Sequence, residues 1–191
     1  HRARTILIVC PASLQLKWQA EMQEKFGLEF RVVDTSYLKE LRRSRGIHAN
    51  PWSSFPRLIT SMDWLKSEIP LRFMRDAIPP VPSYPRTFDL LIIDEAARVA
   101  ADLYMAVRPM LAVSGGRLVT LSTPFGARGW WFEAWRSDAD WHRVEVPATA
   151  CPRISPETSS RLLSSTAMVS VSQSCPVSAG AAAAMPSGLL L

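Results

Sequence analysis

The sequence is poor in the residues that build disulfide frameworks and metal centres. Its 191 residues include only three cysteines and three histidines. An odd number of cysteines without close pairing favours neither a disulfide framework nor a four-cysteine metal site, and a reducing cytoplasm is the simplest location. The chain also lacks the unbroken apolar run of about 20 residues that a membrane helix needs. We therefore expect a cytoplasmic protein without a membrane partner.

Glycine is scarce as well, and none of the eight glycines is followed by lysine. A loop that cradles nucleotide phosphates ends in Gly-Lys-Ser or Gly-Lys-Thr, so the sequence contains no such loop. The first residue is His1 rather than methionine, and no signal-peptide cleavage pattern follows it. We expect the chain to be cut at its start.

Charge is unevenly distributed along the chain. Residues 1–86 hold 14 Lys and Arg against 8 Asp and Glu, whereas residues 87–191 hold 8 against 9. The net charge is +5. A basic first half is compatible with a polyanionic partner such as nucleic acid, although a modestly basic surface also occurs in proteins that bind none.

Short apolar runs rich in β-branched residues alternate with longer amphipathic segments, which is typical of an α/β fold with a mostly parallel sheet and helices on both faces. Near-continuous apolar runs indicate strands that are covered on both sides. The predicted strands are residues 5–10, 29–34, 57–60, 88–94 and 117–122, with a weaker sixth at 141–147.

Helices are predicted between these strands. Leu14, Trp18, Met22 and Phe26 recur every fourth residue, so a helix should follow Ser13 as its N-cap. Further helices are expected at about 36–45, at about 62–77, and around Leu103, Val107 and Leu111. The proline-rich stretch 79–85 should be an extended connector.

The composition changes near Pro156. From there to residue 191 the chain is rich in Ser and Ala, carries few charges and shows no clear helical or strand period. Such a composition offers little to pack. We therefore divide the chain into an α/β domain at 1–155 and a low-complexity, disordered or non-native tail at 156–191.

The stretch FDLLIIDEA, residues 88–96, ends an apolar strand with two adjacent carboxylates, Asp94 and Glu95. Ligands collect beyond the carboxyl ends of parallel strands. In the Walker B element of P-loop ATPases, which has this form, the first carboxylate holds Mg²⁺ and the second polarises the water that attacks the γ-phosphate of ATP. The structural alternative is that Asp94 caps the next helix and Glu95 lies in its first turn.

Two blocks around this stretch add a family resemblance. RTILIVCPASLQLKWQAEMQEKFGLEF and ANPWSSFPRLITSMDWLK, followed by FDLLIIDEA, resemble Swi/Snf-type ATPases of helicase superfamily 2 over residues 3–97. The resemblance implies a RecA-like P-loop NTPase lobe. It also implies that one DNA strand runs past five residues, namely Pro11, Ser13, Leu14, Thr60 and Ser61. The alternatives are a helix cap for Ser13 and a strand-end role for Thr60. Ala97 departs from the family, which usually has histidine there.

The segment 88–157 is similar to the ATPase domain of phage terminase large subunits. This second resemblance makes LSTPFG a coupling motif, with Ser122 and Thr123 near the γ-phosphate. A simple turn is the alternative for Ser122 and Thr123. The aromatic residues Trp130, Trp131, Phe132 and Trp135 are at helical spacing, and we expect them to be core rather than a base-stacking platform.

Both resemblances imply the use of ATP and Mg²⁺ to move double-stranded DNA. The sequence therefore predicts a fragment of a DNA-dependent ATPase, helicase-like in the first instance and terminase-like as the alternative. A phosphate-binding loop upstream of His1 and a second motor lobe or a nuclease domain would complete it, so the chain alone should not turn over ATP. A non-catalytic remnant with weak DNA binding is the remaining alternative.

Overall fold

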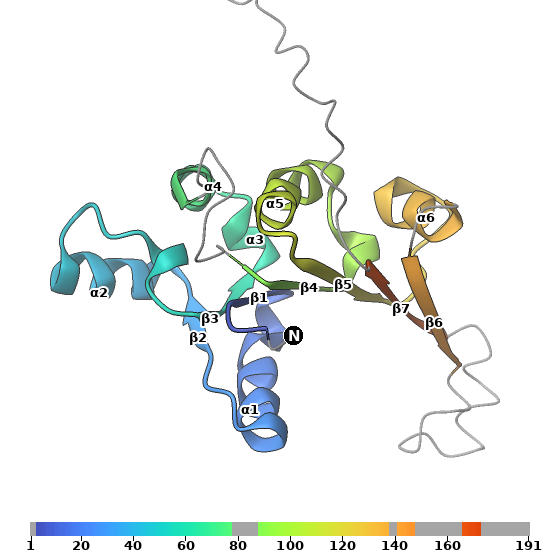
Figure 1. Ribbon diagram of the computed structural model, residues 1–191, viewed down its shortest axis with the longest axis horizontal. Coiled ribbons are helices and arrows are strands. Elements are labelled where there is room, and N and C mark those ends of the chain that lie inside the picture. The colour runs from blue at the N-terminus through green and yellow to red at the C-terminus, as the bar shows by residue number, and fades with distance from the viewer. Residues whose placement is uncertain (1–2, 78–87, 138–140, 148–165, 173–191) are drawn as a thin grey trace, which may run out of the picture.

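The computed structural model describes residues 3–77, 88–137, 141–147 and 166–172. They form one sheet with the strand order β2-β3-β1-β4-β5-β7-β6 (Figure 1). The parallel strands are β1 (Ile6–Cys10), β2 (Arg31–Val33), β3 (Arg57–Ser61), β4 (Leu90–Asp94) and β5 (Arg117–Ser122). The predicted α/β class and mostly parallel sheet are thus confirmed, whereas the RecA-like assignment stays a prediction.

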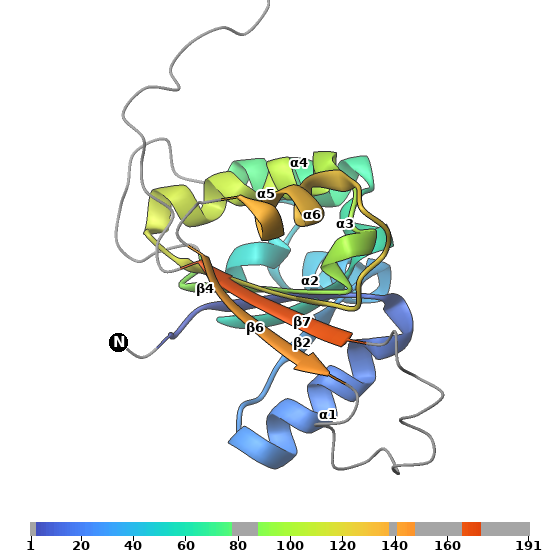
Figure 2. The same cartoon turned by 90° about the vertical axis from the view of Figure 1, so that its right-hand side faces the viewer.

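Helices cover both faces of the sheet, but unequally. One face carries only α1 (Gln15–Phe26) among the described helices (Figure 2). The opposite face is packed by α2 (Thr35–Arg45), α3 (Met62–Leu65), α4 (Glu68–Ala77), α5 (Ala101–Ser114) and α6 (Gly129–Arg136). Short 3₁₀ turns, η1 (Ala12–Leu14), η2 (Pro51–Ser53) and η3 (Ala96–Arg98), join these elements.

Alternation along the strands separates two cores. In β1, Leu7 and Val9 belong to the larger cluster beneath α2 to α6, while Ile6 and Ile8 belong to the smaller cluster beneath α1. Successive strand side chains point to opposite faces, so a fully apolar strand feeds both clusters. The same alternation sends Asp94, two residues after Ile92, toward the face that α1 covers.

Two helix predictions need correction. Ser13 is not an N-cap, because it lies inside η1 and α1 follows Leu14 without a side-chain cap. The predicted helix 62–77 is two helices, α3 and α4. Pro70 explains the break, since it has no N–H to donate to the carbonyl of Lys66 and so cannot continue the helix that begins at Met62.

The sheet ends in an antiparallel hairpin that reaches into the predicted tail. The weak sixth strand is confirmed as β6 (Trp141–Pro147). Its partner is β7 (Thr166–Ser172), which lies between β5 and β6. This part of the tail is therefore a strand, contrary to prediction. The rest of 156–191, and the predicted connector 79–85, lie outside the described residues.

Candidate functional site at the carboxyl edge of the sheet

Because β1, β3, β4 and β5 are parallel, their carboxyl ends share one edge of the sheet. The structure therefore brings all of the predicted site residues to this edge. They are Pro11, Ser13 and Leu14 after β1, Thr60 and Ser61 at the end of β3, Asp94 and Glu95 at β4, and Ser122 and Thr123 at β5. Ligands of open parallel sheets bind at such an edge.

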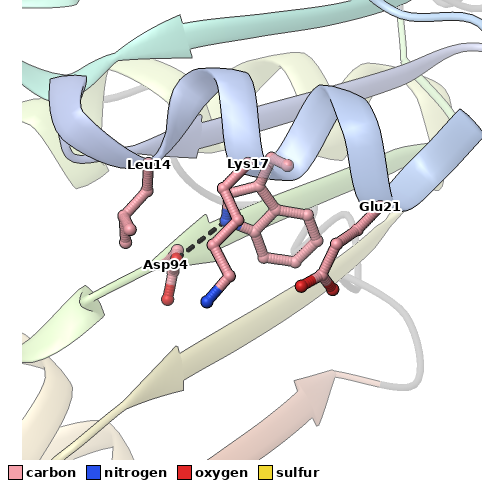
Figure 3. Close-up of a pocket in the computed structure, with 5 residues that line it drawn as sticks. Leu14, Lys17, Glu21 and Asp94 are labelled. Atoms are coloured by element: carbon pink, nitrogen blue, oxygen red, sulfur yellow. Dashed lines mark hydrogen bonds between the residues drawn. The ribbon is translucent and has the colours of Figure 1, made fainter.

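Asp94 is half-buried and faces α1. Its Oδ2 accepts a hydrogen bond of 2.8 Å from the indole Nε1 of Trp18 (Figure 3). Beside this bond lies a hollow of about 150 Å³, lined by Leu14, Lys17, Trp18, Glu21 and Asp94. The carboxylate thus borders a small polar space that also holds the Lys17 ammonium group.

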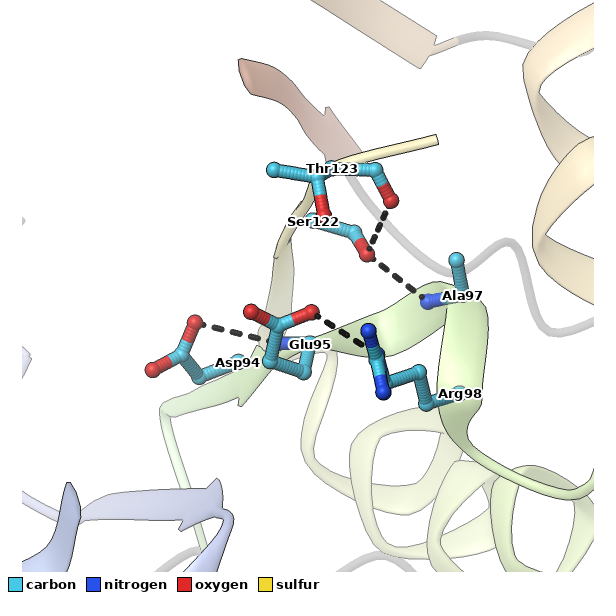
Figure 4. Close-up of polar contacts among 6 residues, drawn as sticks. All are labelled: Asp94, Glu95, Ala97, Arg98, Ser122 and Thr123. Atoms are coloured by element: carbon cyan, nitrogen blue, oxygen red, sulfur yellow. Dashed lines mark hydrogen bonds and ion pairs between the residues drawn. The ribbon is translucent and has the colours of Figure 1, made fainter. Parts of the chain in front are cut away.

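Glu95 has the only positive φ among the described non-glycine residues, at 53°. A left-handed backbone costs an L-residue roughly 1–2 kcal/mol. Its N–H donates to Oδ1 of Asp94 at 3.0 Å, and its Oε2 forms an ion pair with Nε of Arg98 at 3.6 Å (Figure 4). That oxygen is buried and accepts no hydrogen bond from the described residues. Strain and an unsatisfied oxygen at one residue are features that cluster at functional sites.

Ser122 ties β5 to the segment after β4. Its Oγ accepts a hydrogen bond from the backbone N–H of Ala97 at 3.1 Å and donates to the carbonyl of Thr123 at 2.8 Å. This hydrogen bond connects the ends of β4 and β5 through the backbone of Ala97, the position at which the sequence departs from the resembled family.

Neither Asp94 nor Glu95 fits the structural alternative fully. Glu95 stands at the N-cap position of η3, but neither side chain caps that turn. Ser122 is buried and serves the turn after β5, as its alternative predicts, while Thr123 is exposed. Among the aromatic residues of α6, Trp131 is buried and donates from Nε1 to Oγ1 of Thr120, which confirms a core role for that ring.

The residues at the ends of β1 and β3 differ in what they offer. Ser13 is exposed and makes no hydrogen bond in the described parts of the chain. Thr60 is fully buried and donates from Oγ1 to the carbonyl of Val33 at 3.1 Å. Ser61 is buried too, and its Oγ accepts the N–H of Trp64 at the start of α3. The hydroxyls of Thr60 and Ser61 are therefore occupied by the fold.

Cys10 lies between these two strand ends. Its side chain is fully buried, with Sγ 4.0 Å from the carbonyl oxygen of Thr60. Burial, and then the negative charge of Asp94, raise the pKa of the thiol to about 12. The thiol stays protonated at neutral pH and is inert as a nucleophile.

The structure adds three residues to the predicted site. The sequence predicts Trp18 on the apolar face of α1, but its indole N–H also needs a partner, which is Asp94. Lys17 and Arg98 are not predicted as site residues. The position of Arg98, three residues after Glu95, was the available signal, since such a spacing within a helical turn brings side chains together.

The described residues contain no group of three or more His, Cys, Asp or Glu side chains arranged to hold a metal ion. In the same part of the chain, no helix combines the length and hydropathy needed to span a bilayer.

Comparison with known proteins identifies partial relatives. No family model matches the chain. It is 30% identical over 129 residues to the RNA polymerase-associated protein RapA of Stutzerimonas stutzeri, covering 64% of this chain and 12% of the relative. It is 35% identical over 96 residues to RapA of Actinobacillus succinogenes, covering 50% and 9%. The chain thus spans about a tenth of the length of these relatives.

Among solved structures, the chain was aligned with the methyltransferase domain of bacterial CtHen1, at 13% identity over 88% of this chain and 89% of that one. The TM-score is 0.38, which is too low to support a common fold. The similarity to RapA is therefore the comparison that bears on function, and it concerns part of a much longer protein.

Proposed function

We propose that the chain is part of a RecA-like motor lobe from a Swi/Snf-type, helicase-like ATPase that moves on double-stranded DNA. RapA is itself a helicase-like protein of the Swi/Snf family, so the relatives agree with the resemblance found in the sequence. The observation that carries the proposal is the acidic pair at the carboxyl edge, where Glu95 has a strained backbone and a buried oxygen that accepts no hydrogen bond from the described residues.

In this proposal Asp94 would hold Mg²⁺ and Glu95 would orient the water that attacks ATP. The donor set fits in part. Two carboxylates suit Mg²⁺, which usually keeps several waters and takes further oxygens from phosphate. The hydrogen bonds from Trp18 and from the N–H of Glu95 orient the carboxylate of Asp94 and leave lone pairs on both oxygens, so it would hold the cation directly or through water.

Fewer residues are available for the proposed DNA path than the sequence predicted. Ser13 and the start of η1 are exposed and available to phosphates, and Lys17 lies one helical turn further along the same edge. The hydroxyls of Thr60 and Ser61 are engaged within the fold, so any contact there would use other atoms. Phosphate contacts of this kind position a protein on DNA without reading its sequence.

A chimaera tests the catalytic part of the proposal. The chain replaces the 129-residue stretch that it matches in RapA of Stutzerimonas stutzeri, which is expected to supply the phosphate-binding loop. Turnover of ATP is measured with and without DNA. If Glu95 is the base, Glu95→Gln lowers turnover by about 10²–10⁴-fold. Glu133→Gln, an exposed glutamate on α6, is the matched control and should leave turnover unchanged.

The proposal would be contradicted if the folded Glu95→Gln chimaera turned over ATP as fast as the unsubstituted chimaera. The chain alone should show no turnover in either form. DNA binding is measured separately, by the dependence of affinity on salt. A steep fall of DNA affinity with ionic strength supports contacts between the chain and DNA phosphates. An absence of binding at low salt indicates a scaffold without affinity for DNA. The terminase resemblance stays a prediction that the RapA similarity does not address.

A further inference from the structure

A second hollow lies beside η3, the turn that follows Glu95. It has a volume of about 390 Å³ and is formed where η3, α5, the loop after β5 and the start of α6 meet. We call it the arginine basin. It is lined by Ala97, Arg98, Val99, Ala100, Ala101, Phe125, Arg128, Gly129 and Trp130. Its volume is within the range of about 300–1,000 Å³ typical of small-molecule sites.

The basin has two guanidinium groups and no carboxylate among its lining residues. Arg128 is exposed and makes no ion pair or side-chain hydrogen bond with any described residue. Arg98 has Glu95 as its ion-pair partner, but at 3.6 Å. Arginine offers a planar fork of donors that matches phosphate oxygens. The basin is therefore an anion site by composition.

An aromatic ring stands beside these charges. Phe125 is 46% exposed, and the guanidinium carbon of Arg98 lies 4.7 Å from its ring centre. Trp130 also lines the hollow, and it is fixed by a 2.8 Å hydrogen bond from Nε1 to the carbonyl of Val99 and by stacking on Tyr104. A large exposed apolar ring in a cationic hollow gives a planar, anionic ligand a surface on which to stack.

The backbone around the basin adds to its positive potential. Both α5 and α6 begin at its wall, at Ala101 and Gly129, and neither has a side-chain cap. The first N–H groups of a helix have no partner inside the helix, and the dipole favours an anion there. These helix ends support the site that the two arginines and the ring define.

We propose that the arginine basin binds a nucleoside phosphate, with the phosphate between Arg98 and Arg128 and the base stacked on Phe125. The nucleotide is either free or one unit of a single-stranded nucleic acid, since both present the same chemistry. This site adjoins the acidic pair through the ion pair of Arg98 with Glu95, but its ligand contacts neither carboxylate in the proposal. It does not depend on a catalytic role for Asp94 or Glu95, nor on the double-stranded path near Ser13.

The test uses the full chain and a labelled short oligothymidylate, with binding followed by fluorescence anisotropy. Arg128→Ala and Phe125→Ala should each weaken binding on the order of tenfold, the loss expected for one phosphate contact or one stacked base. Arg136 and Phe132 form a similar pair at the far end of α6 and do not line the basin. Arg136→Ala and Phe132→Ala are therefore matched controls that should bind normally.

Competitors distinguish the two sources of the ligand. An abasic strand of equal length should bind about tenfold more weakly, and Phe125→Ala should remove that difference. If a mononucleotide displaces the oligomer at a similar concentration, the ligand of the basin is a free nucleotide. If the mononucleotide does not compete, the ligand is a single strand. Three results would overturn the proposal: unchanged binding by Arg128→Ala, an equal loss in the Arg136→Ala control, or equal displacement by polyglutamate.

Discussion

The ends of β3 and β4 lie on either side of the end of β1. The sequence predicts site residues at both ends, but their polar side chains differ in hydrogen bonding in the structure. At β3 the hydroxyls of Thr60 and Ser61 are buried and bonded to neighbouring backbone. At β4 the carboxylate of Glu95 is held on a left-handed backbone with an oxygen that accepts no hydrogen bond from the described residues. The hydroxyls at β3 stabilise the fold, whereas Glu95 at the end of β4 costs it stability.

The effect of a polar group on the free energy of unfolding therefore indicates whether its role is structural or functional. A buried group that satisfies its neighbours raises the free energy of unfolding when it is present. A strained or unsatisfied group lowers that free energy and persists when it serves something else. Substitutions at the two strand ends should therefore change stability in opposite directions, and denaturant unfolding can measure both.

The largest effect on stability is expected at Thr60. Thr60→Val keeps the shape of the side chain but leaves the carbonyl of Val33 without the hydroxyl, and should lower the free energy of unfolding by about 1–3 kcal/mol. Thr123→Val makes the same change at an exposed position at the end of β5 and should have no measurable effect. Equal stability of the two variants would remove the distinction.

Ser61→Ala removes the N-cap of α3 and should cost about 1 kcal/mol. The control is Ser13→Ala, because Ser13 was expected to cap α1 but caps nothing. This control should be neutral within about 0.5 kcal/mol. Urea unfolding of both variants measures whether the hydroxyl of Ser61 stabilises the start of its helix and that of Ser13 does not.

Glu95→Gly should act in the opposite direction. Glycine adopts the left-handed region without the penalty of a Cβ, so the variant should gain up to about 1 kcal/mol in stability. Glu95→Gln keeps the backbone strain and should be close to neutral, since the exposed Arg98 pair contributes little. A loss of stability in Glu95→Gly would show that the carboxylate supports the fold.

The smallest effect concerns Cys10, between the two strand ends. Its pKa is raised from 9.0 to about 12, so the unfolded chain releases the thiol proton first as the pH rises. The contribution is fully present below pH 9 and is lost above it, by roughly 0.8 kcal/mol between pH 8 and 9.5. Cys10→Ala should lose this pH dependence when unfolding is compared across that range. An identical slope in both chains would place the thiol in contact with water.

The positions of most strands in the sequence could be predicted from local patterns, because apolar runs of β-branched residues are a strong signal for buried strands. The predicted strand 117–122 has the same bounds as β5. The break in the predicted helix 62–77 has a signal in the sequence, Pro70, because proline cannot donate a backbone hydrogen bond. β7 was missed for another reason. Its partners are β5 and β6, so its pairing depends on contacts distant in sequence.

The candidate site was predictable in its residue types and its edge of the sheet, since parallel strands bring their carboxyl ends together. Side-chain direction was not predictable. Whether a hydroxyl at a strand end turns inward, as Thr60 does, depends on packing from both neighbouring strands. Nor could the sequence show that Arg98 and Phe125 would meet, because they approach through the loop after β5.

The bond between Trp18 and Asp94 gives α1 an unusual position. The same indole ring packs in the smaller core and donates to the carboxylate at the strand end. The position of this helix and the orientation of the carboxylate are therefore coupled. A tilt of α1 away from the sheet would remove the indole donor from Asp94, and a rotation of that carboxylate would remove a contact that holds α1 in place.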